Sequence, residues 1–157
     1  MVAERLGFDR EEALTLGRAV AGLNAYSKGV LLGLYEPSPE AEHDRRKEAQ
    51  AGQSLHVRLR LRSVPVVQTP DGVRALSKDK PDSPASVERY LQSKFGDRLG
   101  DARQAMERLA ASDDPGELAT RAYALYDRFR PGIPDCVQGW GAAGELGLDL
   151  IEQLARK

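Results

Sequence analysis

Residues 55–62 read Leu-His-Val-Arg-Leu-Arg-Leu-Arg, and this stretch decides the fold class. Apolar and polar side chains alternate along it without a break. Successive side chains of a β-strand point to opposite faces, so a period of two predicts a strand with one buried and one exposed face. The apolar set is Leu55, Val57, Leu59 and Leu61, and the opposite set is His56, Arg58, Arg60 and Arg62.

Two shorter apolar runs follow and complete a small antiparallel sheet. Residues 64–68 and 73–76 are joined by Thr69-Pro70-Asp71-Gly72, a typical turn composition. Pro65 has no backbone N–H, so we expect it at a sheet edge or at the start of a strand. These runs predict two or three strands at roughly residues 54–76.

The segment before the sheet has the period of an α-helix. Asp9 and Glu12 fit a capping box, in which each side chain accepts a hydrogen bond from the other residue's backbone N–H. Apolar residues then recur at helical spacing, which predicts a helix over residues 10–27. Gly29 is placed to end this helix in a left-handed conformation.

Gly17 and Gly22 lie inside this predicted helix, where each costs about 0.5–1 kcal/mol relative to alanine. We expect another element to pack closely against them as compensation. Their spacing also matches a phosphate-binding loop, but Leu23 stands where that motif needs a lysine. The helical interpretation is therefore preferred.

The chain beyond residue 83 also has a helical pattern. Ser83-Pro84 and Asp114-Pro115 are typical helix starts. Pro131 is expected to end the helix that begins at Asp114-Pro115. A last helix is expected after residue 144. Together these patterns predict an α+β fold that is mostly helical, with five to six helices and one small antiparallel sheet in the middle of the chain.

A length of 157 residues fits a single domain, and its one cysteine excludes a disulfide framework or a multi-cysteine zinc site. Within this domain we expect three parts. Residues 1–76 hold a helix and the β-hairpin, residues 77–83 have the composition of a linker, and residues 84–157 form a helical half.

The first twenty residues resemble a helix-turn-helix motif, and a β-hairpin after it would make a winged variant. The positions that fit the motif are Ala3, Gly7, Phe8, Ala13 and Leu16. The second helix, however, begins with Asp9, Glu11 and Glu12, which would face phosphates. A helix that reads bases presents Arg, Lys, Asn or Gln there. We therefore expect the shape of this motif without a base-reading helix.

The net charge of −1 conceals an asymmetry along the chain. Residues 1–44 carry a net −4, residues 45–80 a net +6 and residues 81–157 a net −3. The positive segment contains the basic strand, on which side chains of one face lie about 6.6–6.8 Å apart, within a factor of two of the phosphate spacing along one nucleic-acid strand. The candidate nucleic-acid-binding residues are Arg58, Arg60, Arg62, Arg74 and Lys78.

Other interpretations of this basic face stay open. The arginines could form a solvated face, pair with acidic groups of residues 1–44, or bind an acidic protein or a second copy of the chain. No aromatic side chains are interleaved with them, which argues against a stacking platform for single strands. The leading hypothesis is a non-enzymatic regulatory protein that binds nucleic-acid backbone. The alternatives are a protein-interaction module or homo-oligomeric structural protein, and an enzyme whose site is not recognised.

Residues 131–144 form a long segment without a regular period, which is typical of functional or mobile loops. Trp140, the only tryptophan, either closes the carboxyl-terminal core or serves as an interaction contact. Cys136 lies in the same loop, and nothing in the sequence brings His43 or His56 to it as an activating base. We therefore predict no catalytic residue, no metal site and no cofactor.

The amino-terminal residues lack the basic and apolar pattern of a signal peptide. The most apolar stretch, residues 19–35, is interrupted by Lys28 and is short for a membrane span. We expect a cytoplasmic protein without membrane contact.

Two stretches resemble a group of small, uncharacterised bacterial proteins that have no established activity. Residues 17–29 read GRAVAGLNAYSKG, and residues 128–151 contain RFRPGIP and GWGAAGELGLDLI. This resemblance covers about a quarter of the chain and implies no catalytic or binding residue.

Overall fold

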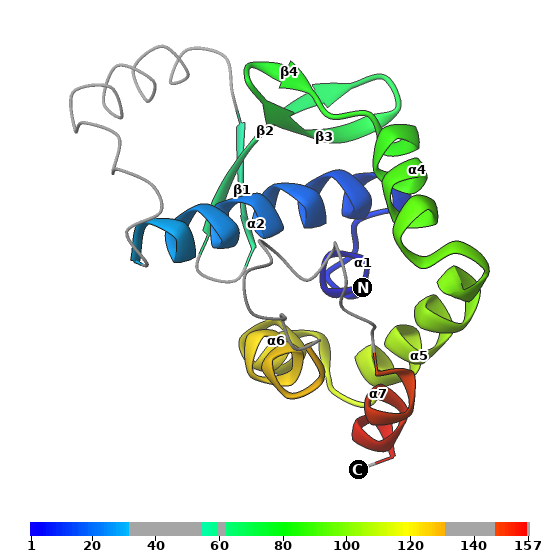
Figure 1. Ribbon diagram of the computed structural model, residues 1–157. Coiled ribbons are helices and arrows are strands. Elements are labelled where there is room, and N and C mark those ends of the chain that lie inside the picture. Colours follow the sequence, from blue (N-terminus) through cyan, green and yellow to red (C-terminus); the bar gives the residue numbers. More distant parts are fainter. Residues whose placement is uncertain (32–54, 60–61, 131–146, 157) are drawn as a thin grey trace. The chain divides into compact units, whose positions relative to one another are not determined.

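The computed structural model describes residues 1–31, 55–59, 62–130 and 147–156. Far more than twice as many of these residues lie in helices as in strands, and the strands form one antiparallel sheet in the order β1-β2-β3-β4. The predicted α+β class, mostly helical with a small sheet in mid-chain, is confirmed (Figure 1).

The helices are α1 (Val2–Arg5), α2 (Arg10–Leu31), α4 (Pro84–Phe95), α5 (Leu99–Ala111), α6 (Pro115–Phe129) and α7 (Leu148–Ala155), with a 3-10 turn at Gly96–Arg98. The strands are β1 (Leu55–Leu59), β2 (Arg62–Thr69), β3 (Gly72–Ser77) and β4 (Lys80–Pro81). The chain divides into two compact units, Asp9–Val87 and Met1–Phe8 with Glu88–Lys157. The boundary lies within α4, and the expected linker over residues 77–83 contains the short strand β4 and the buried Asp82.

The inner strand β2 uses its two halves for different neighbours. Residues 62–66 pair with β1, and residues 66–69 pair with β3, so that Val66 belongs to both pairings. Pro65 pairs with His56, and the pairing with β3 begins only at the next residue. A residue without an N–H is therefore accommodated where β2 has one neighbour, as the edge rule requires.

The basic strand expected over residues 55–62 is in fact two arms of a hairpin. β1 ends at Leu59, β2 begins at Arg62, and these two residues face each other in the register. Arg62 therefore shares a face with Leu59, whereas Arg58 lies opposite Ser63 on the other face. The prediction that Arg58 and Arg62 share one face is wrong, because alternation continues in both arms and does not reveal where the chain reverses.

One face of the sheet forms the core of the unit Asp9–Val87. Leu59, Val64, Val66 and Ala75 are all buried there, and α2 lies alongside β2 and β3 (Figure 1). The apolar face of β1 is buried only toward its end, since Leu59 is 4% exposed but Leu55 is 61% exposed.

The capping box at the start of α2 is confirmed. The N–H of Glu12 donates to Asp9 Oδ1 at 2.8 Å, and the N–H of Asp9 donates to Glu12 Oε2 at 3.0 Å. The sequence predicts that the helix ends at Gly29, but it continues to Leu31. Within the described part of the chain, a Cβ at Gly17 or Gly22 would meet no atom within 4 Å beyond the backbone of its own helix, so the close packing expected against these glycines is not found there.

The other unit is built on a helical core. Its buried apolar residues are Ala105, Leu109, Ala110, Leu118, Leu125, Phe129, Ile151 and Leu154. As the sequence predicts, α6 begins at Asp114-Pro115, and the Asp114 carboxylate accepts from the N–H groups of Gly116 and Glu117. Arg5 near the chain start donates to the carbonyl of Asp113, which connects α1 to the start of α6.

We predict opposite effects from the same substitution at two glycines. Gly72 has φ +104°, and a Cβ there would lie 2.6 Å from Glu12 Oε1. Gly72→Ala should lower the free energy of unfolding by about 2–3 kcal/mol, because it adds left-handed strain and displaces the Glu12 carboxylate. Gly17→Ala, in open space on a helix, should raise it by about 0.5–1 kcal/mol. Urea unfolding of the full chain measures both, and a neutral Gly72→Ala would contradict the strain and the close approach to Glu12 at this turn.

Candidate nucleic-acid interface

The sequence singled out five basic residues and one tryptophan, and the structure places four of them. Arg58 on β1 and Lys78 between β3 and β4 are exposed. Arg62, the first residue of β2, is half-buried, and Arg74 in the middle of β3 is only 5% exposed. The remaining candidates, Arg60 and Trp140, lie outside the described residues, as does the segment over residues 131–144 that contains Cys136.

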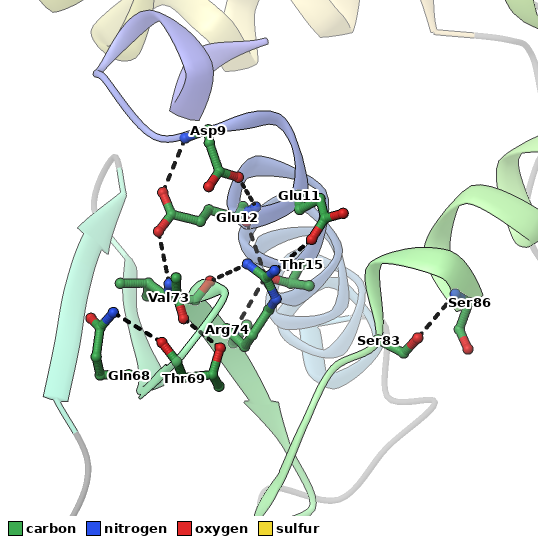
Figure 2. Close-up of polar contacts among 12 residues, drawn as sticks. Asp9, Glu11, Glu12, Thr15, Gln68, Thr69, Val73, Arg74, Ser83 and Ser86 are labelled. Carbon is green, nitrogen blue, oxygen red and sulfur yellow. Dashed lines mark hydrogen bonds and ion pairs between the residues drawn. The ribbon is translucent and has the colours of Figure 1, made fainter.

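Arg74 is engaged within the protein. Its Nη2 donates to Glu11 Oε2 at 2.5 Å, and its Nη1 donates to the carbonyl of Val73 at 3.2 Å (Figure 2). The register does place Arg74 on the same face as Arg58, as expected. Its guanidinium is nevertheless drawn to the acidic first turn of α2, so the expectation that it extends an exposed basic row is wrong.

The first two turns of α2 satisfy backbone N–H groups on the outer edge of β3 (Figure 2). The N–H of Val73 donates to Glu12 Oε1 at 2.7 Å, and the N–H of Ala75 donates to the hydroxyl of the fully buried Thr15 at 3.2 Å. The carbonyl of Ala75 accepts from the N–H of Asp82 at 2.8 Å. Backbone groups that an edge strand would expose are thereby paired, the two N–H groups with side chains of α2 and the carbonyl with the backbone of Asp82.

Two further cations of this unit also have internal partners. Arg62 Nε donates to Asn24 Oδ1 on α2 at 3.2 Å, and Arg18 Nη1 lies 3.2 Å from Oδ1 of the buried Asp82. Sequence reasoning allowed for pairing between the arginines and the acids of residues 1–44, but could not assign the partners. The sequence contains one signal for the Arg74 partner. Glu11 is an acidic residue in the first turn of α2 that takes no part in the capping box.

Three cations of the sheet remain available to a ligand. Arg58, Lys78 and Lys80 are exposed, and within the part of the chain that the structure describes no acidic side chain forms an ion pair with them. Lys78 and Asp79 form the β3–β4 turn with φ of 51° and 62°. These side chains can supply positive charge to an anionic surface.

The other unit has a surface hollow of about 370 Å³ between α5 and α7. Arg108, Ser112, Glu152 and Arg156 contribute to its lining. Both arginines pair with Glu152, at 3.3 Å and 3.8 Å, so this carboxylate already compensates much of their charge. The hollow is therefore a weaker candidate for an anion than the cations of the sheet.

Known proteins offer no relative from which a function could be inferred. No family model, no curated protein and no solved structure matches the chain. Among the described residues, no helix has the length and apolar character needed to cross a bilayer. The same residues contain no cluster of three or more His, Cys, Asp or Glu side chains that could hold a metal ion.

We predict that substitutions of Arg74 and of its partner Glu11 change the stability by different amounts. Glu11→Ala leaves the buried Arg74 guanidinium without its carboxylate and should cost about 1–3 kcal/mol of unfolding free energy. Arg74→Met should cost less than about 1 kcal/mol, because the Glu11 side chain is 61% exposed and returns to water. Denaturant unfolding of both variants provides the comparison, and a larger loss for Arg74→Met would refute this assignment.

Proposed function

We propose that this chain is a non-enzymatic binding protein whose sheet contacts the phosphate backbone of nucleic acid through Arg58, Lys78 and Lys80. The observation that carries the proposal is the difference between these three cations and their neighbours. Arg18, Arg62 and Arg74 are held by partners inside the unit, whereas the three exposed cations have no ion-pair partner among the described residues. Exposed charges of one sign provide the sequence-independent attraction to phosphates.

This arrangement supports backbone contact rather than base reading. The first turn of α2 is acidic, and both Glu11 and Glu12 are committed to β3. A carboxylate-rich helix start cannot approach phosphates favourably. The basic contacts therefore come from the strands and the β3–β4 turn, where lysine acts as a point charge without base preference.

The triple variant Arg58→Gln, Lys78→Gln, Lys80→Gln tests this function. Three phosphate contacts give the unmodified chain a slope of log K against log salt of about −2.7, and the variant should lose most of this slope and bind all sequences more weakly. Fluorescence anisotropy with labelled DNA at about 50–200 mM salt measures both quantities.

A matched control removes the same number of positive charges from the other unit. The variant Arg98→Gln, Arg128→Gln, Arg156→Gln changes exposed side chains only and should retain the salt slope of the unmodified chain. If the two triple variants weaken binding equally, net charge alone explains the effect. If the unmodified chain does not bind at about 50 mM salt, the proposed function is refuted.

A second candidate function is supported by the position of β1. This strand is terminal in the sheet, no strand of the described segments pairs with its outer edge, and Leu55 on it is 61% exposed. Such an edge can accept an added strand from a second copy of the chain. This function predicts a concentration-dependent dimer that His56→Pro abolishes, because the N–H of His56 faces away from β2, and sedimentation velocity measures it. A monomer throughout the micromolar range would exclude it.

A further inference from the structure

The turn between β3 and β4 has an uncommon residue choice. Ser77 pairs with Lys80, and the two residues between them, Lys78 and Asp79, both have left-handed backbone conformations. Two-residue hairpin turns of this kind favour Asn-Gly or Asp-Gly, because both central residues need φ above zero. Asp tolerates this conformation better than Lys does. Lys78 is therefore held in a conformation that a different residue would adopt more easily.

The base of this hairpin is firmly anchored. Asp82, directly after β4, is 8% exposed, and its N–H donates to the carbonyl of Ala75 at 2.8 Å. Its carboxylate lies 3.2 Å from Arg18 on α2. Contacts to a neighbouring strand and a helix thus restrain the chain immediately beyond the turn. A side chain presented on an anchored turn loses less conformational freedom on binding than one on a free loop.

The turn carries two of the three available cations, with the exposed Asp79 carboxylate between them. Lys78 and Lys80 lie two positions apart, are both exposed, and have no ion-pair partner in the described ranges. Lys78 strains the turn, and its charge is exposed to solvent. The described contacts give it no stabilising role. Strain of this kind is found at sites where function maintains it.

We propose that the β3–β4 turn is the tip that docks on the phosphate backbone of a nucleic-acid duplex, with Lys78 and Lys80 as its contacts. This inference rests on the proposed function and assigns its ligand. A duplex is favoured because none of the strands β1 to β4 carries a Phe, Tyr or Trp on which unpaired bases could stack. A duplex also offers twice the phosphate density of a single strand along its axis.

The double variant Lys78→Asn, Asp79→Gly tests the tip without changing net charge. Asn-Gly is the preferred pair for this turn, so the variant should unfold at the same or a higher temperature than the unmodified chain. Its affinity for a DNA duplex should nevertheless fall, and its salt slope should decrease in magnitude by about 0.9, the value of one phosphate contact. Lys78→Gln, which keeps Asp79, should show the same loss if the double variant does not fold.

Arg58→Gln in the same titration separates this inference from the proposed function. An unchanged affinity and slope for the turn variants, together with weaker binding by Arg58→Gln, would refute the tip and leave the proposed function standing. Absence of binding by the unmodified chain would refute both. Tighter binding of a single strand than of the duplex of the same sequence would overturn the assignment of a duplex.

Discussion

The architecture of the unit Asp9–Val87 depends on the two hydrogen bonds that the Glu12 carboxylate accepts. One oxygen accepts from the N–H of Asp9 and closes the cap of α2, and the other accepts from the N–H of Val73 and attaches the helix to β3. Gly72 lies beside it at φ +104°, and a Cβ there would lie 2.6 Å from Oε1, so a side chain at this position would strain the turn and displace the carboxylate. A single acid thereby connects the start of a helix to a strand that lies sixty-one residues further along the chain.

The neighbouring residues of the first turns of α2 extend this connection. Thr15 satisfies the N–H of Ala75, and Glu11 holds the Arg74 guanidinium. Because β3 has no long neighbour beyond its outer edge, the helix takes over the role of a further strand. The helix position in turn selects which face of the sheet is buried, and Leu16, Val64 and Val66 are fully buried as a result.

The acidic first turn of α2 also determines which cations of the unit are buried and which are exposed. Arg74 becomes internal because Glu11 lies within reach, whereas Arg58 and the lysines of the β3–β4 turn stay outside. The positive excess that the sequence shows over residues 45–80 is therefore not one continuous surface. Its described part divides into internal pairs that hold the fold and exposed charges on two parts of the sheet, and only the latter can serve a ligand.

Local patterns determined much of the fold. The cap at Asp9 and Glu12, the start of α6 at Asp114-Pro115 and the alternation around Leu55–Leu59 each depend on residues close in sequence, so they could be predicted. Whether Gly17 has a packing neighbour depends on long-range placement, and the sequence carries no signal of it.

The class of the fold, the starts of α2, α4 and α6 and the presence of a basic strand segment could be predicted from the sequence alone, because backbone preferences and hydrophobic periodicity act over a few residues. Which arginines face water depends instead on tertiary contacts. A reversal between Leu59 and Arg62 moved one arginine to the opposite face, and the approach of Glu11 to Arg74 buried another. The first outcome depends on the point at which the strand turns. The second depends on a contact between segments far apart in the chain. An alternating pattern is the same on either side of such a turn and therefore cannot show it.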